Sequence, residues 1–181
     1  MAPQSVRQVV PKPLTLATLS EVLRRLVDES VSIRDLKSIL EALSQVAATE
    51  RDTLSLAEHV RTQMRRPLSH QWTQGAARLA VILLDPSLEE VIRASITRTS
   101  SGAFLALAPS ACRDVVTAIC RALEQAEAKA KNPVLLSAPD IRRFVRRLIE
   151  TELRHLAVIS VAELLPEIAL ETVATATVAN L

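Results

Sequence analysis

The fold class is decided by a short apolar run, Leu79-Ala80-Val81-Ile82-Leu83-Leu84, which Asp85-Pro86 closes. A short apolar run bounded by a turn signal is typical of a buried strand, because a core helix usually needs ten or more residues. Comparable runs follow at residues 134–137 and 157–160, and helical spacing fills the chain around them. Strands that alternate with helices predict a small α/β layer over residues 76–181.

The other elements of this layer are predicted from spacing and prolines. We expect helices over 88–96, from Pro109 to near residue 132, and over 139–153. A short strand at 102–107 and a final edge strand at 168–178 complete the pattern, since the tail is rich in Thr, Val and Ala.

The chain before this layer has helical periodicity and hardly any strand signal. Apolar residues at helical spacing predict three short helices, over about 16–27, 33–46 and 54–66. We expect Ser32 to cap the second, with Asp35 as the capping-box acid. Pro67 should end the third helix, and residues 68–72 should add one more turn.

These patterns predict an α+β or α/β protein in two parts. The predicted organisation is an extended lead-in at 1–13, a helical subdomain at 14–75 and an α/β subdomain at 76–181. Gly75 is the expected joint between the two subdomains, because the helical texture stops there.

Composition excludes several functions. The chain has 181 residues, only 2 glycines and no tyrosine, and its formal net charge is +2. Two glycines are too few for a glycine-rich phosphate-binding loop. Aromatic side chains on which bases could stack are nearly absent. So small a charge creates no strong field toward nucleic acid or membrane.

Metal, cofactor and catalytic motifs are not found. His59, His70 and His155 are scattered and form no HExxH pattern, so we expect no metal, no cofactor and no enzyme. Cys112 and Cys120 stand eight residues apart in one helix, too far for a disulfide, and we expect reduced thiols. No signal peptide or membrane-spanning run is present in the sequence.

Two short helices over 19–46 have the skeleton of a helix-turn-helix. The second of them carries Arg34 and Lys37, but Asp35 and Glu41 offset both cations, which makes a poor phosphate-binding face. A DNA-binding regulator with an α/β sensing domain stays an alternative function, and a small hydrolase is a further one.

The densest charge feature is a group of four arginines in the helix expected over 139–153. It consists of Arg142, Arg143, Arg146 and Arg147. Four cations within two turns could bind an acidic partner. They could equally form a solvated face paired with nearby glutamates, and both interpretations stay open.

The segment at 31–43, VSIRDLKSILEAL, resembles the signature helix in the cytoplasmic domain of the type III secretion export gate, the FHIPEP family. Further segments resemble the family in its own order, at 19–26, 58–61, 68–72, 84–93, 133–142 and 158–164. The segments at 69–71 and 99–107 look more like the injectisome branch than the flagellar one. The sequence departs from the family at Ala108, Val161 and Ala162, where an acidic, an aromatic and a polar residue are usual.

The resemblance implies a non-enzymatic part of an export apparatus. Family members form a nonameric ring and receive export substrates with chaperones, a gatekeeper and the stalk of the secretion ATPase. It implies no nucleic-acid partner and a place at the cytoplasmic face of the bacterial inner membrane. The family's membrane region and two further cytoplasmic subdomains are missing here, so we expect a soluble C-terminal fragment that is monomeric alone.

Two hypotheses about sites follow from the resemblance and the charge pattern. Glu21, Arg34 and Asp35 are expected to help form the ring seam. Arg142, Arg143, Arg146 and Arg147 are expected to supply a basic edge for an acidic partner.

Overall fold

The computed structural model describes residues 9–10, 12–99 and 102–178. The chain divides into two compact units, residues 1–68 and 69–181. Helix α5 (Arg65–Thr73) contains the division, whereas the sequence placed the joint slightly later, at Gly75. Most of the expected lead-in at 1–13 lies outside the described residues. Within the described ranges, no helix combines the length and the apolar character needed to cross a membrane.

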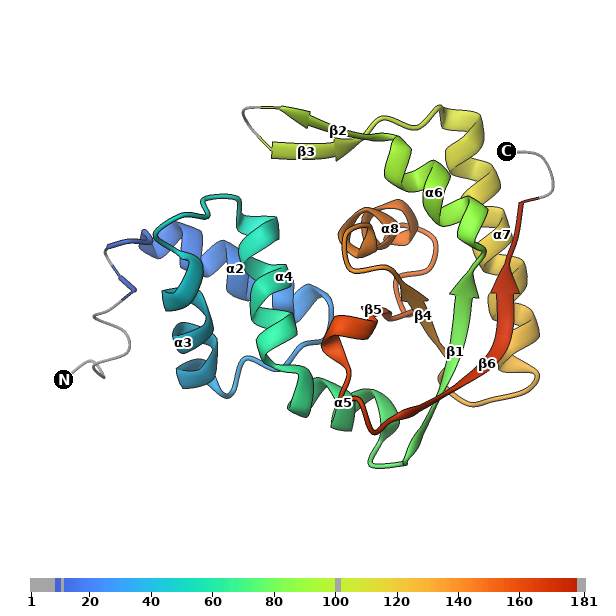
Figure 1. Ribbon diagram of the computed structural model, residues 1–181, viewed down its shortest axis with the longest axis horizontal. Helices are drawn as coiled ribbons and strands as arrows, with labels where there is room; N and C mark the ends of the chain where they lie inside the picture. The colour runs from blue at the N-terminus through green and yellow to red at the C-terminus, as the bar shows by residue number, and fades with distance from the viewer. Residues whose placement is uncertain (1–8, 11, 100–101, 179–181) are drawn as a thin grey trace. The chain divides into compact units, whose positions relative to one another are not determined.

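The first unit contains α2 (Leu16–Asp28), α3 (Leu36–Val46) and α4 (Thr53–Gln63), as the periodicity predicts. Helix α4 packs against both α2 and α3 (Figure 1). Their buried apolar side chains form the core of this unit: Leu19, Val22, Leu26, Ile39, Leu40, Leu43, Leu56 and Val60.

Helix α2 ends in a Schellman motif. The Val31 N–H donates to the Leu26 carbonyl at 2.8 Å, and the Ser30 N–H donates to the Val27 carbonyl at 2.9 Å. Ser30 has a φ of 60°, a position that glycine usually occupies. The buried side chains of Leu26 and Val31 add the apolar contact that often accompanies this motif.

Two expected helix boundaries were wrong. Asp35, not Ser32, caps α3, because its carboxylate accepts the Ser38 N–H and the helix starts only at Leu36. Pro67 does not end a helix. It lies in the first turn of α5, where a missing N–H leaves no intrahelical bond unmade.

The second unit is built on a four-stranded sheet. Its strands are β1 (Arg78–Leu84), β4 (Val134–Ser137), β5 (Val158–Ser160) and β6 (Ala169–Ala176), in the order β5-β4-β1-β6. All neighbours are parallel, with Val81 opposite Val134 and Leu135 opposite Val158. The α/β class and the edge position of the last strand are confirmed.

Helices α6 (Pro86–Ala94), α7 (Pro109–Glu127) and α8 (Arg142–Ile149) contribute to the larger core of this unit (Figure 1). That core holds Ile82, Leu135 and Val158 of the sheet. Residues alternate along the strands, so Val81, Leu136 and Ile159 enter a smaller second core. Trp72 of α5 packs against this second core.

The expected helix over 88–96 begins and ends two residues earlier than predicted. Ser95 ends α6, and its hydroxyl donates to the Val91 carbonyl at 2.8 Å. Ile96 starts β2 (Ile96–Thr99), which pairs antiparallel with β3 (Gly102–Leu105). The β-branched residues of β2 favour a strand over helix continuation. Helix α8, in contrast, is shorter than its expected span of 139–153, and a turn precedes it.

Candidate docking surfaces

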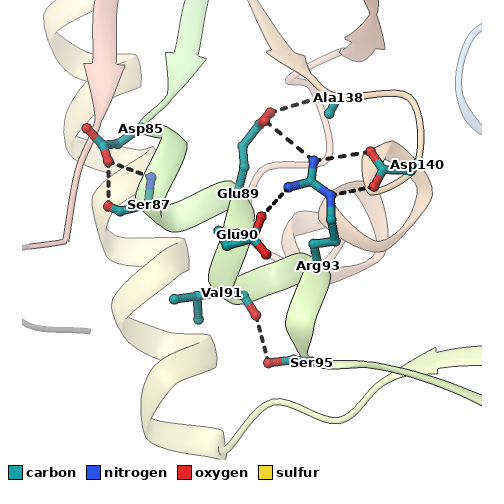
Figure 2. A network of polar contacts seen from close by, with 9 residues as sticks. All are labelled: Asp85, Ser87, Glu89, Glu90, Val91, Arg93, Ser95, Ala138 and Asp140. Atoms are coloured by element: carbon teal, nitrogen blue, oxygen red, sulfur yellow. Dashed lines mark hydrogen bonds and ion pairs between the residues drawn. The ribbon is translucent and has the colours of Figure 1, made fainter.

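Helix α8 carries the predicted arginines, and a polar network fixes the turn before it to α6 (Figure 2). The Arg93 guanidinium donates through Nε to Asp140 Oδ2 at 2.6 Å and through a second nitrogen to Asp140 Oδ1 at 3.3 Å. It also donates to Glu90 at 2.8 Å. Glu89 accepts the backbone N–H of Ala138 at 2.8 Å. The position of this turn is therefore set by side chains of α6.

Asp140 and Asp85 are held in their charged form by hydrogen bonds. The hydrogen bond from Arg93 lowers the pKa of Asp140 below its ordinary value. Asp85 caps α6 and accepts hydrogen bonds from the hydroxyl and the N–H of Ser87, which lower its pKa. The same contacts with Asp140 and Glu90 raise the pKa of Arg93. Asp140, Asp85 and Arg93 are therefore all charged near neutral pH.

Arg142 connects α8 to strand β5 and to the turn that follows it. Its side chain is 0% exposed, and Nη1 donates to the Val158 carbonyl at 3.0 Å. Nε lies 3.5 Å from Oε1 of Glu163, which is 1% exposed. Glu163 Oε1 also accepts the N–H and the hydroxyl of Ser160, each at 3.1 Å. A buried cation is thus paired with a buried anion that caps the turn after β5, η1 (Val161–Glu163).

Arg146 anchors the other end of α8. Nη1 donates to the Leu156 carbonyl at 3.1 Å, and Nη2 donates to the Arg154 carbonyl at 3.3 Å. These bonds satisfy backbone groups in the connection to β5, and they leave the Arg146 side chain only half-exposed.

The predicted four-arginine edge is therefore reduced by the structure to Arg143 and Arg147. Arg142 is wholly buried and cannot face a partner in this fold, which corrects that part of the hypothesis. Arg147 is exposed, and Arg143 is half-buried with its guanidinium 4.8 Å from the centre of the Phe144 ring. The two residues are four apart and lie on one face of α8, in the sector that also holds Glu150.

The residues predicted for a ring seam occupy two places in the first unit. Glu21 is on α2 and forms ion pairs with Arg24 at 2.6 Å and Arg25 at 3.0 Å. Arg34 and Asp35 are exposed in and beside the connection before α3. Hydrogen bonds from Ser38 lower the pKa of Asp35. Within the described part of the chain, no hydrogen bond or ion pair joins Glu21 to Arg34 or Asp35.

The structure adds two apolar residues to this surface that sequence reasoning missed. Ile33 is 37% exposed and Leu36 is 40% exposed, on either side of Arg34 and Asp35. Their helical spacing with Ile39, Leu40 and Leu43 would by itself predict that both are buried. We call residues 33–36 the α3 entry surface. Exposed aliphatic side chains beside charges are the composition of a protein contact more than of a ligand site.

No metal site was found among the described residues, in which no group of three His, Cys, Asp or Glu side chains could hold an ion. Cys112 and Cys120 are free thiols. Burial, with Glu152 and Glu124 nearby, raises the pKa of Cys120 and keeps that thiol protonated.

Comparisons with known proteins identify the family of this chain. The family model that matches is that of the FHIPEP family, over residues 1–169. The low calcium response locus protein D of Yersinia pestis is 35% identical over 165 residues, covering 91% of this chain and 23% of that protein.

Solved structures agree over almost the whole chain. The Chlamydia pneumoniae CdsV protein superposes with a TM-score of 0.87 at 41% identity, covering 97% of this chain and 50% of that one. The nonameric SctV-C of EPEC superposes with a TM-score of 0.80 at 33% identity, over 94% of this chain and 50% of that one. A complex of CdsV with CdsO also matches, with a TM-score of 0.83 at 41% identity over 96% of this chain and 49% of that one.

The chain belongs to the FHIPEP family of type III secretion export gate proteins, and the resemblance seen in the sequence is confirmed. It spans about a quarter of the curated relative and half of the solved chains.

Proposed function

We propose that this chain forms part of the cytoplasmic ring of a type III export gate and acts through protein contacts, without catalysis. Family membership over nearly the whole chain is the observation that carries the proposal. It also favours this function over a DNA-binding regulator. The nonameric assembly of SctV-C supports a ring, and the complex of CdsV with CdsO supports a partner.

In this proposal the α3 entry surface contributes to the contact between neighbouring copies in the ring. Ile33 and Leu36 supply apolar area, and Arg34 with Asp35 supplies one charge of each sign. A ring contact is heterologous, so this surface would meet a different patch on the next copy. Glu21 is a further proposed seam residue, although its carboxylate already pairs with Arg24 and Arg25 within α2.

The second proposed surface is the α8 edge, formed by Arg143 and Arg147, which would receive an acidic partner. Three anchors fix the helix that bears them: the Arg93–Asp140 bridge, the buried Arg142–Glu163 pair and the bonds of Arg146. A rigid helix presents its charges with little loss of entropy on binding. The proposed partners are the stalk of the secretion ATPase, gatekeeper proteins and chaperone-bound export substrates at the inner membrane.

The test uses a chimera in which this chain replaces the matched segment of nonameric SctV-C. Light scattering should show a ring for the chimera and loss of the ring after Ile33→Glu with Leu36→Glu. Arg143→Glu with Arg147→Glu should keep the ring and slow association with an acidic partner. A chimera that forms only dimers in all versions would contradict the ring proposal.

A further inference from the structure

The first half of β6 is open on both faces and along one edge. Ala169, Leu170, Glu171 and Thr172 are all exposed, and Leu170 retains 42% of its accessible surface. Strand β6 ends the strand order and pairs with β1 alone (Figure 1). No other strand of the described chain lies along its outer edge.

One backbone hydrogen bond shows which N–H and C=O groups lie on the outer edge of β6. The Ala169 N–H donates to the Ala77 carbonyl at 3.0 Å, on the β1 side. Consecutive residues of a strand direct their N–H and C=O groups to opposite sides. Glu171 therefore also faces β1, whereas Leu170 and Thr172 present their N–H and C=O groups outward. Such a row of groups is a template for another extended chain.

The second half of β6, unlike the first, is protected against pairing with another strand. The register with β1 shifts between Val81 and Ile82, which leaves Val173 as a bulged residue. Lys129 Nζ donates to the Val173 carbonyl at 2.7 Å. A bulge and a lysine are two devices that block pairing at sheet edges. The first half of the strand has neither device.

We propose that residues 170–172 form a docking edge for an extended peptide segment that carries a basic side chain and joins the sheet as an additional strand. The inference rests on the proposed docking function and names the kind of segment that is bound. Because both faces are exposed here, alternate side chains of the segment meet no covering layer on either face.

The negative charge of this segment favours a peptide with a basic side chain. Glu167 and Glu171 are the two charged residues of the stretch 167–172, and both are exposed. A basic side chain opposite Glu171 forms a favourable cross-strand pair. A second copy of β6 would instead bring another Glu171 to the same edge, which like-charge repulsion disfavours.

The test measures binding of two synthetic octapeptides to the 181-residue chain. Both alternate threonine and valine, and they differ by a central lysine or glutamate. The lysine peptide should bind more tightly and should slow hydrogen exchange at the Leu170 and Thr172 amides. Thr172→Pro removes an outward N–H and breaks no bond to β1, so the fold should be kept. Binding should weaken about tenfold, the equivalent of one hydrogen bond.

Thr175→Pro is the matched control. The Ala176 carbonyl accepts the Asp85 N–H on the β1 side, so Thr175 also faces outward, but in the protected half. Its peptide affinity should equal that of the wild type. Equal binding of both peptides, or unchanged binding by Thr172→Pro, would overturn the proposal. A dimer of the chain alone that Thr172→Pro abolishes would show that the occupant is a second copy. Ring formation and arginine-dependent docking are measured separately, so their proposal survives any of these failures.

Discussion

Replacement of Glu163 by alanine should lower the free energy of unfolding by far more than the loss of its few side-chain atoms would. Arg142 is fully buried, and Glu163 is the buried anion beside its guanidinium. Glu163→Ala leaves this cation in the interior without that charge and takes the acceptor from the Ser160 N–H and hydroxyl. Breaking a buried pair from one side typically costs about 3–5 kcal/mol. For a chain of this size that corresponds to a fall in Tm of roughly 6–20 °C.

The assay is urea and thermal unfolding of Glu163→Ala, Arg142→Met and the double variant. The double variant should recover at least about half of the loss, because no uncompensated charge stays buried and Met fills part of the volume. Arg147→Glu is the exposed-face control and should change Tm by less than about 2 °C. A loss below about 1 kcal/mol for Glu163→Ala, or strict additivity in the double variant, would refute the reasoning.

Three further outcomes are expected. Arg143→Glu with Arg147→Glu should lower the association rate with an acidic partner by at least about tenfold at low salt, and the difference should shrink as salt rises, which stopped-flow mixing can follow. Asp140→Asn should cost at most about 1 kcal/mol at pH 7, since Asp140 is half-exposed. The pKa of Asp140 is lowered in the fold, so its contribution is present above pH 4 and is lost as pH falls through the folded pKa. Wild type and Asp140→Asn should therefore converge in acid, and a gap that stays constant to pH 2 would exclude this bridge. Ser30→Gly should stabilise the first unit by about 0.5 kcal/mol in thermal unfolding, because it relieves a positive φ at the end of α2; a lower Tm would show that the serine side chain matters more.

Three strands of the sheet could be predicted because they are mostly buried parallel strands, which appear in sequence as continuous apolar runs. The runs at 79–84, 134–137 and 157–160 each match a strand of the sheet to within one residue. Of the hairpin strands, β3 was predicted and β2 was not, since Ile96 fits the helical spacing of α6 as well as it fits a strand.

The different environments of the four arginines of α8 were not predicted from the sequence. Four residues were treated as one basic cluster, but helical geometry separates them. Ile149 follows Arg142 by seven residues, so at about 100° per residue Arg142 projects onto the buried stripe. Its partner could have been suspected, because Ser160 and Glu163 have the spacing of a capping box. The bond between Arg93 and Asp140, 47 residues apart, has no local signal, since only the packed fold brings them together.

We propose that the α3 entry surface joins copies of this chain into a ring. The most direct measurement is the mass, by light scattering over a concentration series, of the SctV-C chimera with and without Ile33→Glu and Leu36→Glu. The account predicts a nonamer for the unchanged chimera and a monomer for the variant. A variant that still forms nonamers at the same concentrations would contradict it.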